Sequence, residues 1–568
     1  MGGSFPALHS RSSLAIALVF LFAAVFFLPY LVPVAPSVSL AYLVGYSNHT
    51  ALVIFVVGSV LFGLLCRNRF AENVSADEPL GLTSLIVALV IASAACFFRL
   101  FPLTKHHVGT EASYALNRVQ MLVQGLRPYR DFEFAYGPAH LYIPDLIARV
   151  NHRSIIFGYY AWWILQWILG TTMLWTAIRL LELPLSRRRG VFWALFSIQF
   201  SAIIAEGTAY TPTRTIGSAF FVVLVAWLLN PSRKSLLVPV TAILCVGVAL
   251  AISPEQGIAV FAGLLVWFIL LNTTGADPLP VSITILFFMG AVMLLLSCWR
   301  LGEFATLLVF SKGAYSFPLL PSPTNIAILA CYIAAACAAV CTLVAKRFDS
   351  VAVPLFFTGF ALLPVAMGRC DVGHLLMATP ALLLGIAAIE ARPPLRIWWS
   401  PLAILLVGIP AVVPFFLWLT GYLHEESTAA YWRNGSVPAI LGRHPCTVIY
   451  RTVNIAPKAS ETAAQDCLDT GRYDRTNNAF TPQTVDIMID HLDQQPLHPI
   501  LLADLPLSEQ LEPADARLNT VRIFEVSPWL PRPKNPPFTY EKLQRYIEQN
   551  YTPSRTPVAD FRIWYPKH

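Results

Sequence analysis

The chain has 568 residues, of which 56% are hydrophobic and only 12% are charged, and its mean hydropathy is +0.61. Soluble globular proteins carry about 25% charged residues, so this composition excludes that class and predicts a polytopic α-helical membrane protein. The net charge of +7 is better explained by basic residues in membrane loops than by a nucleic-acid-binding surface. The sequence has no glycine-rich phosphate loop, CxxC pair or HExxH motif, which argues against a nucleotide-driven pump and a zinc site.

Apolar runs of the roughly 17–25 residues that a bilayer requires recur along the first three quarters of the chain. They lie at about 14–35, 50–66, 83–101, 154–180, 190–206, 215–230, 235–252, 256–271, 280–298, 324–345, 351–367, 373–389 and 397–421. The first run is longer than the apolar core of 7–15 residues of a signal peptide, so we expect a retained helix. The sequence thus predicts about 13 transmembrane helices.

Basic residues in the short loops predict the orientation. With the N-terminus in the cytoplasm, the cytoplasmic loops hold Arg67, Arg69, Arg187, Arg188, Arg189, Arg233, Lys234, Lys346, Arg347, Arg392 and Arg396. The opposite short loops at 36–49 and 207–213 contain no Lys or Arg, and one cytoplasmic loop, at 272–280, also has none. Positive charge concentrates in cytoplasmic loops of membrane proteins, so this pattern predicts a cytoplasmic N-terminus and an extracytoplasmic C-terminal part.

The composition changes after the last apolar run. Residues 422–568 are polar and rich in proline, whereas residues 1–421 contain all of the predicted spans. Short buried strands are expected in "CTVIYRTVNI" and "HPILLADL", and amphipathic helices in "TPQTVDIMIDHLDQQ" and "TYEKLQRYIEQNY". The sequence therefore predicts a transmembrane domain at 1–421 followed by a small extracytoplasmic α/β domain at 422–568.

The cysteines follow the same division. Eight of the ten lie in or beside apolar runs, where Cys usually acts as a small core residue, and only Cys446 and Cys467 lie in the polar C-terminal part. An extracytoplasmic location permits a disulfide between these two, and two free thiols are the alternative.

Polar residues gather in the predicted external loops, while the spans are almost free of charge. The candidates for a site are Glu111 and Asp131 in the long first loop at 102–153, then Arg214, Glu255, Lys312, Arg369, Asp371 and His374 in later loops. Charges at helix ends often only reach toward the interface, so each residue alone has a structural explanation. A transporter places ionisable groups nearer the membrane midplane, whereas an external site suits a substrate with a lipid tail and a reacting head group.

The first external loop also contains a recognisable pattern. "GTEASYALNRVQMLVQGLRPYRDFEFAYGPAHLYIP" has an acidic residue, a small residue and Tyr, then G-x-x-P-Y-x-D-F and a GP pair, which here are Glu111, Ser113, Tyr114, Gly125, Pro128, Tyr129, Asp131, Phe132, Gly137 and Pro138. "GRCDVGH" fits an R-x-D-x-x-H element. In these motifs, and in the layout of residues 80–420, the chain resembles GT-C membrane glycosyltransferases of the family-39-like and RgtA/B/C/D-like branch.

The resemblance implies a GT-C fold and transfer of a sugar, usually with inversion, from a polyprenyl-phosphate donor. Glu111 matches the family's general base, which is usually Asp, and Asp131 is the second candidate. A positioned carboxylate activates the hydroxyl of a glycan or protein acceptor. Cationic groups stabilise the departing phosphate, and the candidates are Arg214, Arg369, His374 and Lys312. Glu255 and Asp371 complete the predicted substrate-binding set.

The same resemblance implies a bacterial cell (inner) membrane as the location, with membrane lipid and a lipid-linked sugar as partners and no nucleic acid. No metal or other cofactor is predicted, although the carboxylates of the external loops could form an oxygen-rich site. Two alternatives to an enzyme stay open. One is a non-catalytic or transport protein, such as a lipid-linked glycan flippase or accessory subunit, and the other is a membrane anchor whose function lies in residues 422–568.

Overall fold

The structure of the chain is a computed structural model. It describes residues 11–34, 39–66, 80–105, 136–181, 183, 185–206, 211–229, 237–273, 288, 290, 316–370, 372–389, 446–448, 467–469, 486, 489–490, 492–493, 500–503, 534–535, 541–556 and 561–567, and between 115 and 134 it describes positions 115, 118–119, 121–123, 125, 127–128 and 134.

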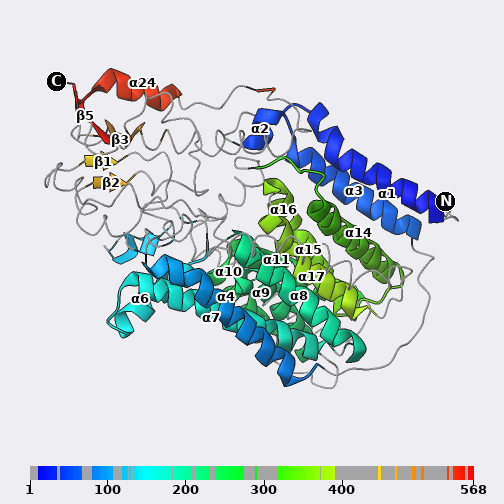
Figure 1. Ribbon diagram of the computed structural model, residues 1–568. Coiled ribbons are helices and arrows are strands. Elements are labelled where there is room, and N and C mark those ends of the chain that lie inside the picture. Colours follow the sequence, from blue (N-terminus) through cyan, green and yellow to red (C-terminus); the bar gives the residue numbers. More distant parts are fainter. Residues whose placement is uncertain are drawn as a thin grey trace.

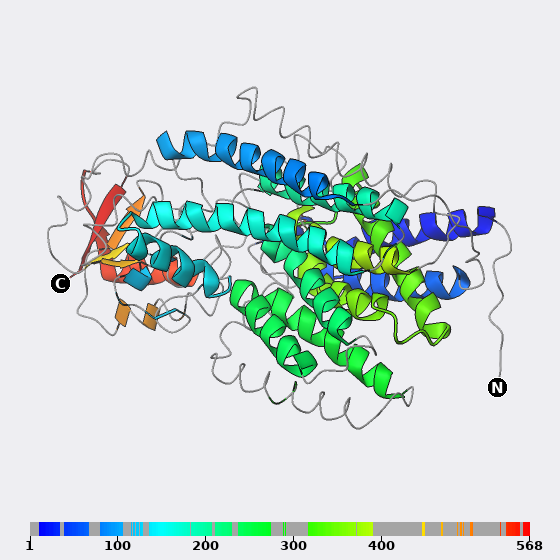
Figure 2. The same cartoon turned by 90° about the horizontal axis from the view of Figure 1, so that it is seen from below.

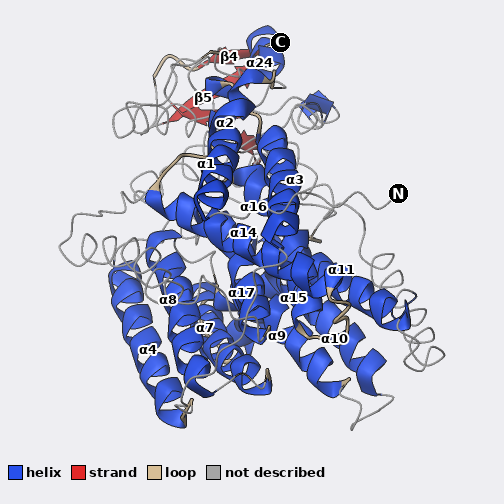
Figure 3. Cartoon of the chain, turned by 90° about the vertical axis from the view of Figure 1, so that its right-hand side faces the viewer, coloured by secondary structure: helices blue, strands red, loops and turns tan. Residues whose placement is uncertain are grey.

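Most of the described residues are helical (Figure 3). One group of helices comes from the N-terminus and from the region after residue 316, and comprises α1 (Arg11–Phe27), the 3-10 turn η1 (Leu28–Leu31), α2 (Leu40–Val44), α3 (Asn48–Cys66), α14 (Pro323–Val344) and α16 (Leu363–Arg369). Helix α3 packs against α1, α14 and α16. Segments nearly 300 residues apart in sequence therefore lie side by side (Figure 1).

The second group is built around α7 (Ile155–Leu180), which packs against α6 (Ala139–Val150) and α9 (Pro212–Leu228). Its other members are α4 (Leu82–Lys105), α8 (Leu185–Glu206), α10 (Leu237–Ile252), α11 (Pro254–Thr273), α15 (Ala352–Ala361) and α17 (Val372–Ala388). Figure 2 shows α6 and α7 reaching toward the end of the molecule where the C-terminus lies. Helix α17 joins the two groups because it packs against α14 and α16 as well as α9 and α15.

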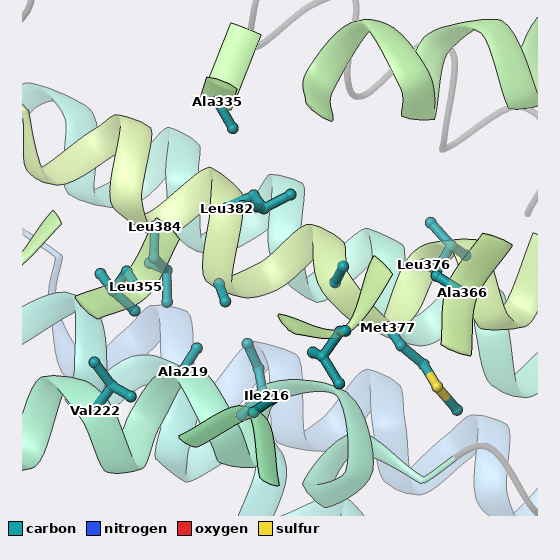
Figure 4. Close-up of a cluster of buried hydrophobic side chains, with 14 of the residues drawn as sticks. Ile216, Ala219, Val222, Ala335, Leu355, Ala366, Leu376, Met377, Leu382 and Leu384 are labelled. Atoms are coloured by element: carbon teal, nitrogen blue, oxygen red, sulfur yellow. The ribbon is translucent and has the colours of Figure 1, made fainter. Parts of the chain in front are cut away.

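The centre of the helical region is a dry apolar core. Ile216, Ala219 and Val222 of α9 face Leu355 of α15 and Leu384 of α17 (Figure 4), and all are buried. Small residues permit the closest approach: a Cβ on Gly263 of α11 would collide with Pro354 and Thr358 of α15. Close helix contact through small residues is the common packing mode inside membranes.

The observed helices coincide with all of the predicted spans except 280–298 and 397–421, which lie almost wholly outside the described residues. Among the described residues, five helical segments are long and apolar enough to cross a bilayer: Ser13–Leu31, Asn48–Leu65, Pro254–Thr273, Pro323–Val344 and Ala352–Arg369. Further apolar helices are shorter, at Leu82–Ser93, Thr213–Leu228, Val238–Ile252 and Gly373–Ala388. These helices fit a polytopic helical membrane protein, and the count of 13 stays a prediction.

One predicted span is divided. The run at 351–367 forms two helices, α15 and α16, which meet at Leu362. Pro364 stands in the first turn of α16, and proline has no N–H to continue a helical ladder. Apolarity predicted an apolar helical segment here, which the structure confirms, but not this break.

Contacts between turns support the predicted alternation of faces. Asn48 donates two hydrogen bonds of 3.0 Å, to the carbonyl oxygens of Phe317 and Met367, and the Phe317 N–H donates to the Arg369 carbonyl at 2.8 Å. These three turns, all predicted to be external, therefore lie at one end of the helices. The Trp267 indole donates to the Phe348 carbonyl at 2.8 Å, which joins two segments near predicted cytoplasmic turns.

The C-terminal part contains a five-stranded sheet of order β2-β1-β3-β5-β4. Its strands are β1 (Cys446–Val448), β2 (Cys467–Asp469), β3 (Ile500–Ala503), β4 (Tyr551–Pro553) and β5 (Phe561–Pro566). Strand β1 is parallel to β2 and β3, whereas β5 is antiparallel to β3 and β4. Helix α24 (Glu541–Asn550) precedes β4 and buries Leu543 and Ile547, one turn apart. The expected strands at β1 and β3 and the expected helix at α24 are confirmed; the division at residue 421 stays a prediction.

A short segment ties this part to the first helices. The backbone N–H groups of Lys534 and Asn535 donate to the Leu43 carbonyl at 2.8 and 3.1 Å, and the Lys534 ammonium donates to the Tyr30 carbonyl at 3.1 Å. Lys534 also lies against Gly45, which has a left-handed φ of 72° at the end of α2. The C-terminal part is therefore attached at the face formed by the turn between α1 and α3 (Figure 3).

Candidate functional site

A buried ion pair joins two of the predicted site residues. Arg214 lies in the first turn of α9 and Glu255 in the first turn of α11. The Arg214 Nε and Nη2 atoms both donate to Glu255 Oε1, at 3.1 and 2.8 Å, and the two side chains are only 6% and 5% exposed. A carboxylate is favourable at a helix N-terminus and a cation is not, so Glu255 offsets the poor position of Arg214.

An aromatic residue from the first external loop covers the guanidinium. Arg214 Cζ lies 4.5 Å from the centre of the Tyr136 ring, a cation–π distance. Tyr136 also makes edge contacts with Phe134 and His140, with ring centres 5.5 and 6.0 Å apart. Arg214 is therefore held between a carboxylate and an aromatic face, and both fix the plane of its guanidinium.

Gly137 explains how the loop reaches this position. Its N–H donates to the Ile252 carbonyl at the end of α10, at 3.2 Å, and any Cβ at this position would collide with the backbone of Ala251 and Ile252. The Tyr-Gly-Pro sequence therefore brings Tyr136 beside the turn between α10 and α11. Pro138 then caps α6, so His140 follows within its first turn.

His140 is buried and neutral at physiological pH. The Trp162 indole donates to His140 Nδ1 at 3.4 Å, which places the proton of the neutral ring on Nε2. Burial and, secondarily, the positive charge of Arg214 lower the pKa of His140 to about 3, although Glu255 and the Ile252 carbonyl oppose this shift. His140 thus presents an uncharged imidazole beside the ion pair.

Buried polar side chains of α7, α9 and α11 adjoin the ion pair. We call the resulting set the layer around Arg214; it comprises Tyr136, His140, Trp162, Gln166, Thr213, Arg214, Glu255 and Gln256. The Thr213 hydroxyl donates to Gln166 Oε1 at 2.7 Å, and both residues are buried. Gln256 is 1% exposed, and among the described residues neither its amide nitrogen nor its amide oxygen has a hydrogen-bond partner. Unsatisfied buried amides are costly and rare, so Gln256 is a place where a polar ligand or a water molecule would be favourable.

The predicted site residues have different outcomes. Glu111, Asp131, Lys312 and Asp371 lie outside the described residues. Arg369 ends α16, and His374 lies in the first turns of α17 and is 4% exposed. Helix α17 packs against α9, the helix that carries Arg214. The structure thus joins Arg214 directly to Glu255 and places His374 on a helix that packs against α9, whereas Arg369 ends α16, which packs against α17 and α3.

Sequence reasoning missed several members of the layer. Tyr136, His140, Trp162, Gln166 and Gln256 were not among the predicted site residues. A usable signal existed, because Trp162 and Gln166 are four residues apart and so share a face of α7, and Gln is rare in an apolar span. Among the residues that the structure describes, no group of three or more His, Cys, Asp or Glu side chains could hold a metal ion.

Comparison with known proteins gives no further assignment. No protein-family model matches the chain, and no curated protein matches it. The functional argument therefore rests on the residues and their geometry.

Proposed function

We propose that the protein is a GT-C-like membrane glycosyltransferase with about 13 transmembrane helices. It moves a sugar from a polyprenyl-phosphate donor to a glycan or protein acceptor on the extracytoplasmic face of a bacterial cytoplasmic membrane. The observation that carries this proposal is the buried Arg214–Glu255 pair, covered by Tyr136 of the first external loop. Ionisable groups inside membrane proteins are expensive and usually functional.

The proposed reaction divides the work between two kinds of group. A carboxylate of the first loop, Glu111 or alternatively Asp131, takes the proton of the acceptor hydroxyl. The acceptor oxygen then bonds to the anomeric carbon, and the bond from that carbon to the phosphate oxygen breaks. The leaving group is the polyprenyl phosphate, which carries more negative charge than it did in the donor.

Arg214 supplies positive charge to that phosphate, and Glu255 positions the guanidinium. Glu255 engages the edge formed by Nε and Nη2, and because the charges of the pair cancel, an anion site here needs further cations. Arg369, Lys312 and His374 are the candidates for this role, and Asp371 lies between Arg369 and His374 in sequence. The neutral His140 carries no charge at pH 7 and therefore does not repel the Arg214 guanidinium.

The test is sugar transfer in membranes supplied with polyprenyl-phosphate sugars, comparing the wild type with Glu111→Gln. Loss of a general base reduces the rate by about 10²–10⁴-fold, and we expect that loss with little change in protein amount. Glu133→Gln is the matched control, because it makes the same substitution in the same loop at a residue with no proposed role.

Undiminished transfer by Glu111→Gln would remove Glu111 as the base and leave Asp131. Absence of transfer by the wild type, together with movement of a lipid-linked glycan across the membrane, would support the transport alternative instead.

A further inference from the structure

The two cysteines of the polar C-terminal part are register partners in adjacent strands. Strands β1 and β2 are parallel, with Cys446 opposite Cys467, Thr447 opposite Leu468 and Val448 opposite Asp469. The strands are three residues long, and β2 is at the edge of the sheet. The pair thus stands at the first position of two very short strands, 21 residues apart in sequence.

This register suits a disulfide. Neighbouring strands are about 4.7–4.9 Å apart, and disulfides join residues whose Cα atoms are about 4.4–6.8 Å apart. Register partners in adjacent strands also lie on the same face of a sheet. A covalent bond there would fasten the edge strand, which few backbone hydrogen bonds can hold at this length.

The remaining cysteines behave differently. The other eight lie in or beside apolar runs, and two of them, Cys245 and Cys331, are free thiols. Residues 390–568 contain no cysteine besides Cys446 and Cys467. Each is therefore the other's only possible partner within its part of the chain.

We propose that Cys446 and Cys467 form a disulfide bond, and that the C-terminal sheet matures in an oxidising compartment. The two thiols lose two protons and two electrons to the disulfide of a thiol–disulfide oxidant protein, which becomes a dithiol. A thiolate of the pair first forms a mixed disulfide with the oxidant, and the second thiolate then displaces the oxidant. Disulfides persist outside the cytoplasm. The Lys534 contact attaches the C-terminal part at the turn between α1 and α3, so a disulfide in the sheet would also place that turn on the extracytoplasmic side of the membrane.

Peptide mapping of the full-length protein tests this proposal without any activity measurement. The protein is denatured in detergent with N-ethylmaleimide, which blocks free thiols, and is then digested with trypsin without reduction. Cleavage after Arg443, Arg451, Lys458 and Arg472 releases Cys446 and Cys467 on separate peptides, 444–451 and 459–472. We expect these two peptides to be joined and to separate on reduction.

A gel assay gives the matched control. After blocking and reduction, a polyethylene glycol maleimide should add two labels to the wild type and to Cys331→Ser/Cys341→Ser, and none to Cys446→Ser/Cys467→Ser. The proposal is overturned if both peptides of the wild type carry N-ethylmaleimide before reduction, or if either cysteine is bonded to a different thiol. Peptide mapping of the wild type alone decides whether the disulfide is present, so the test remains valid even if a serine variant fails to fold.

Discussion

Two ion pairs of nearly equal length occupy opposite environments in this molecule. Arg214 and Glu255 are 2.8 Å apart with side chains 6% and 5% exposed, whereas Lys542 and Asp486 of the C-terminal part are 2.6 Å apart with side chains 66% and 51% exposed. Water competes with the second pair and screens it. The charges of the first pair are largely removed from water, so removal of one partner leaves the other group buried without an opposite charge. Distance alone therefore says little about what an ion pair contributes.

The largest expected effect follows from breaking the buried pair. Arg214→Ala removes the cation that partners the buried Glu255, and breaking a buried pair in this way costs about 3–5 kcal/mol. We expect the free energy of unfolding in detergent, measured by denaturant titration, to fall by this amount. The double variant Arg214→Met/Glu255→Met should regain most of it, because apolar replacement of both partners removes the unpaired charge. A double variant as unstable as Arg214→Ala would show that the loss comes from packing.

A second effect should appear as a pH dependence of stability at His140. The pKa of His140 is lowered from its ordinary value of 6.5 to about 3 in the folded protein, so the unfolded chain binds the proton more readily. Stability is then fully retained above pH 6.5 and is lost as the pH falls toward 3, by up to about 1.4 kcal/mol per pH unit. His140→Asn keeps an acceptor for the Trp162 indole but cannot titrate.

Melting curves of the wild type and His140→Asn between pH 7 and pH 4 measure this difference. We expect the melting temperatures of the two proteins to converge as the pH falls, because only the wild type loses the stability that the neutral His140 provides. Parallel curves would mean that His140 is protonated in the folded state or exposed to solvent.

The smallest effect is expected for the exposed pair. Lys542→Ala should change the free energy of unfolding by less than about 1 kcal/mol, and added salt should reduce the change further. A loss comparable to that of Arg214→Ala would remove the contrast between the two environments.

The sequence predicted the elements better than their meeting points. The length of the apolar runs located α3, α7 and α14 to within a few residues. A helix in lipid must satisfy its own backbone hydrogen bonds, so it is continuous and can be recognised from an uninterrupted apolar composition. The sheet was partly foreseen, since Ile500, Leu501 and Leu502 form an apolar strand pattern.

The site was only half predictable. Arg214 and Glu255 were both candidates, but a separation of 41 residues gives no indication that they pair, because the pairing depends on the packing of α9 against α11. His140 was missed for the same reason: its burial against Trp162 follows from the docking of Gly137 on the α10–α11 turn. Likewise, composition left Cys446 and Cys467 open between a disulfide and free thiols, and only the strand register placed them opposite each other.

The layer around Arg214 is proposed to serve sugar transfer and not only to hold the helices together. Transfer from a polyprenyl-phosphate sugar by purified Arg214→Lys in lipid vesicles, measured together with the melting temperature of this variant, separates these two roles. Lysine keeps the positive charge but loses the planar fork that Glu255 and a phosphate share. We predict a folded variant whose transfer rate falls by about 10-fold or more. A variant that melts earlier yet transfers sugar at the wild-type rate, or a wild type that transfers none, would contradict the account.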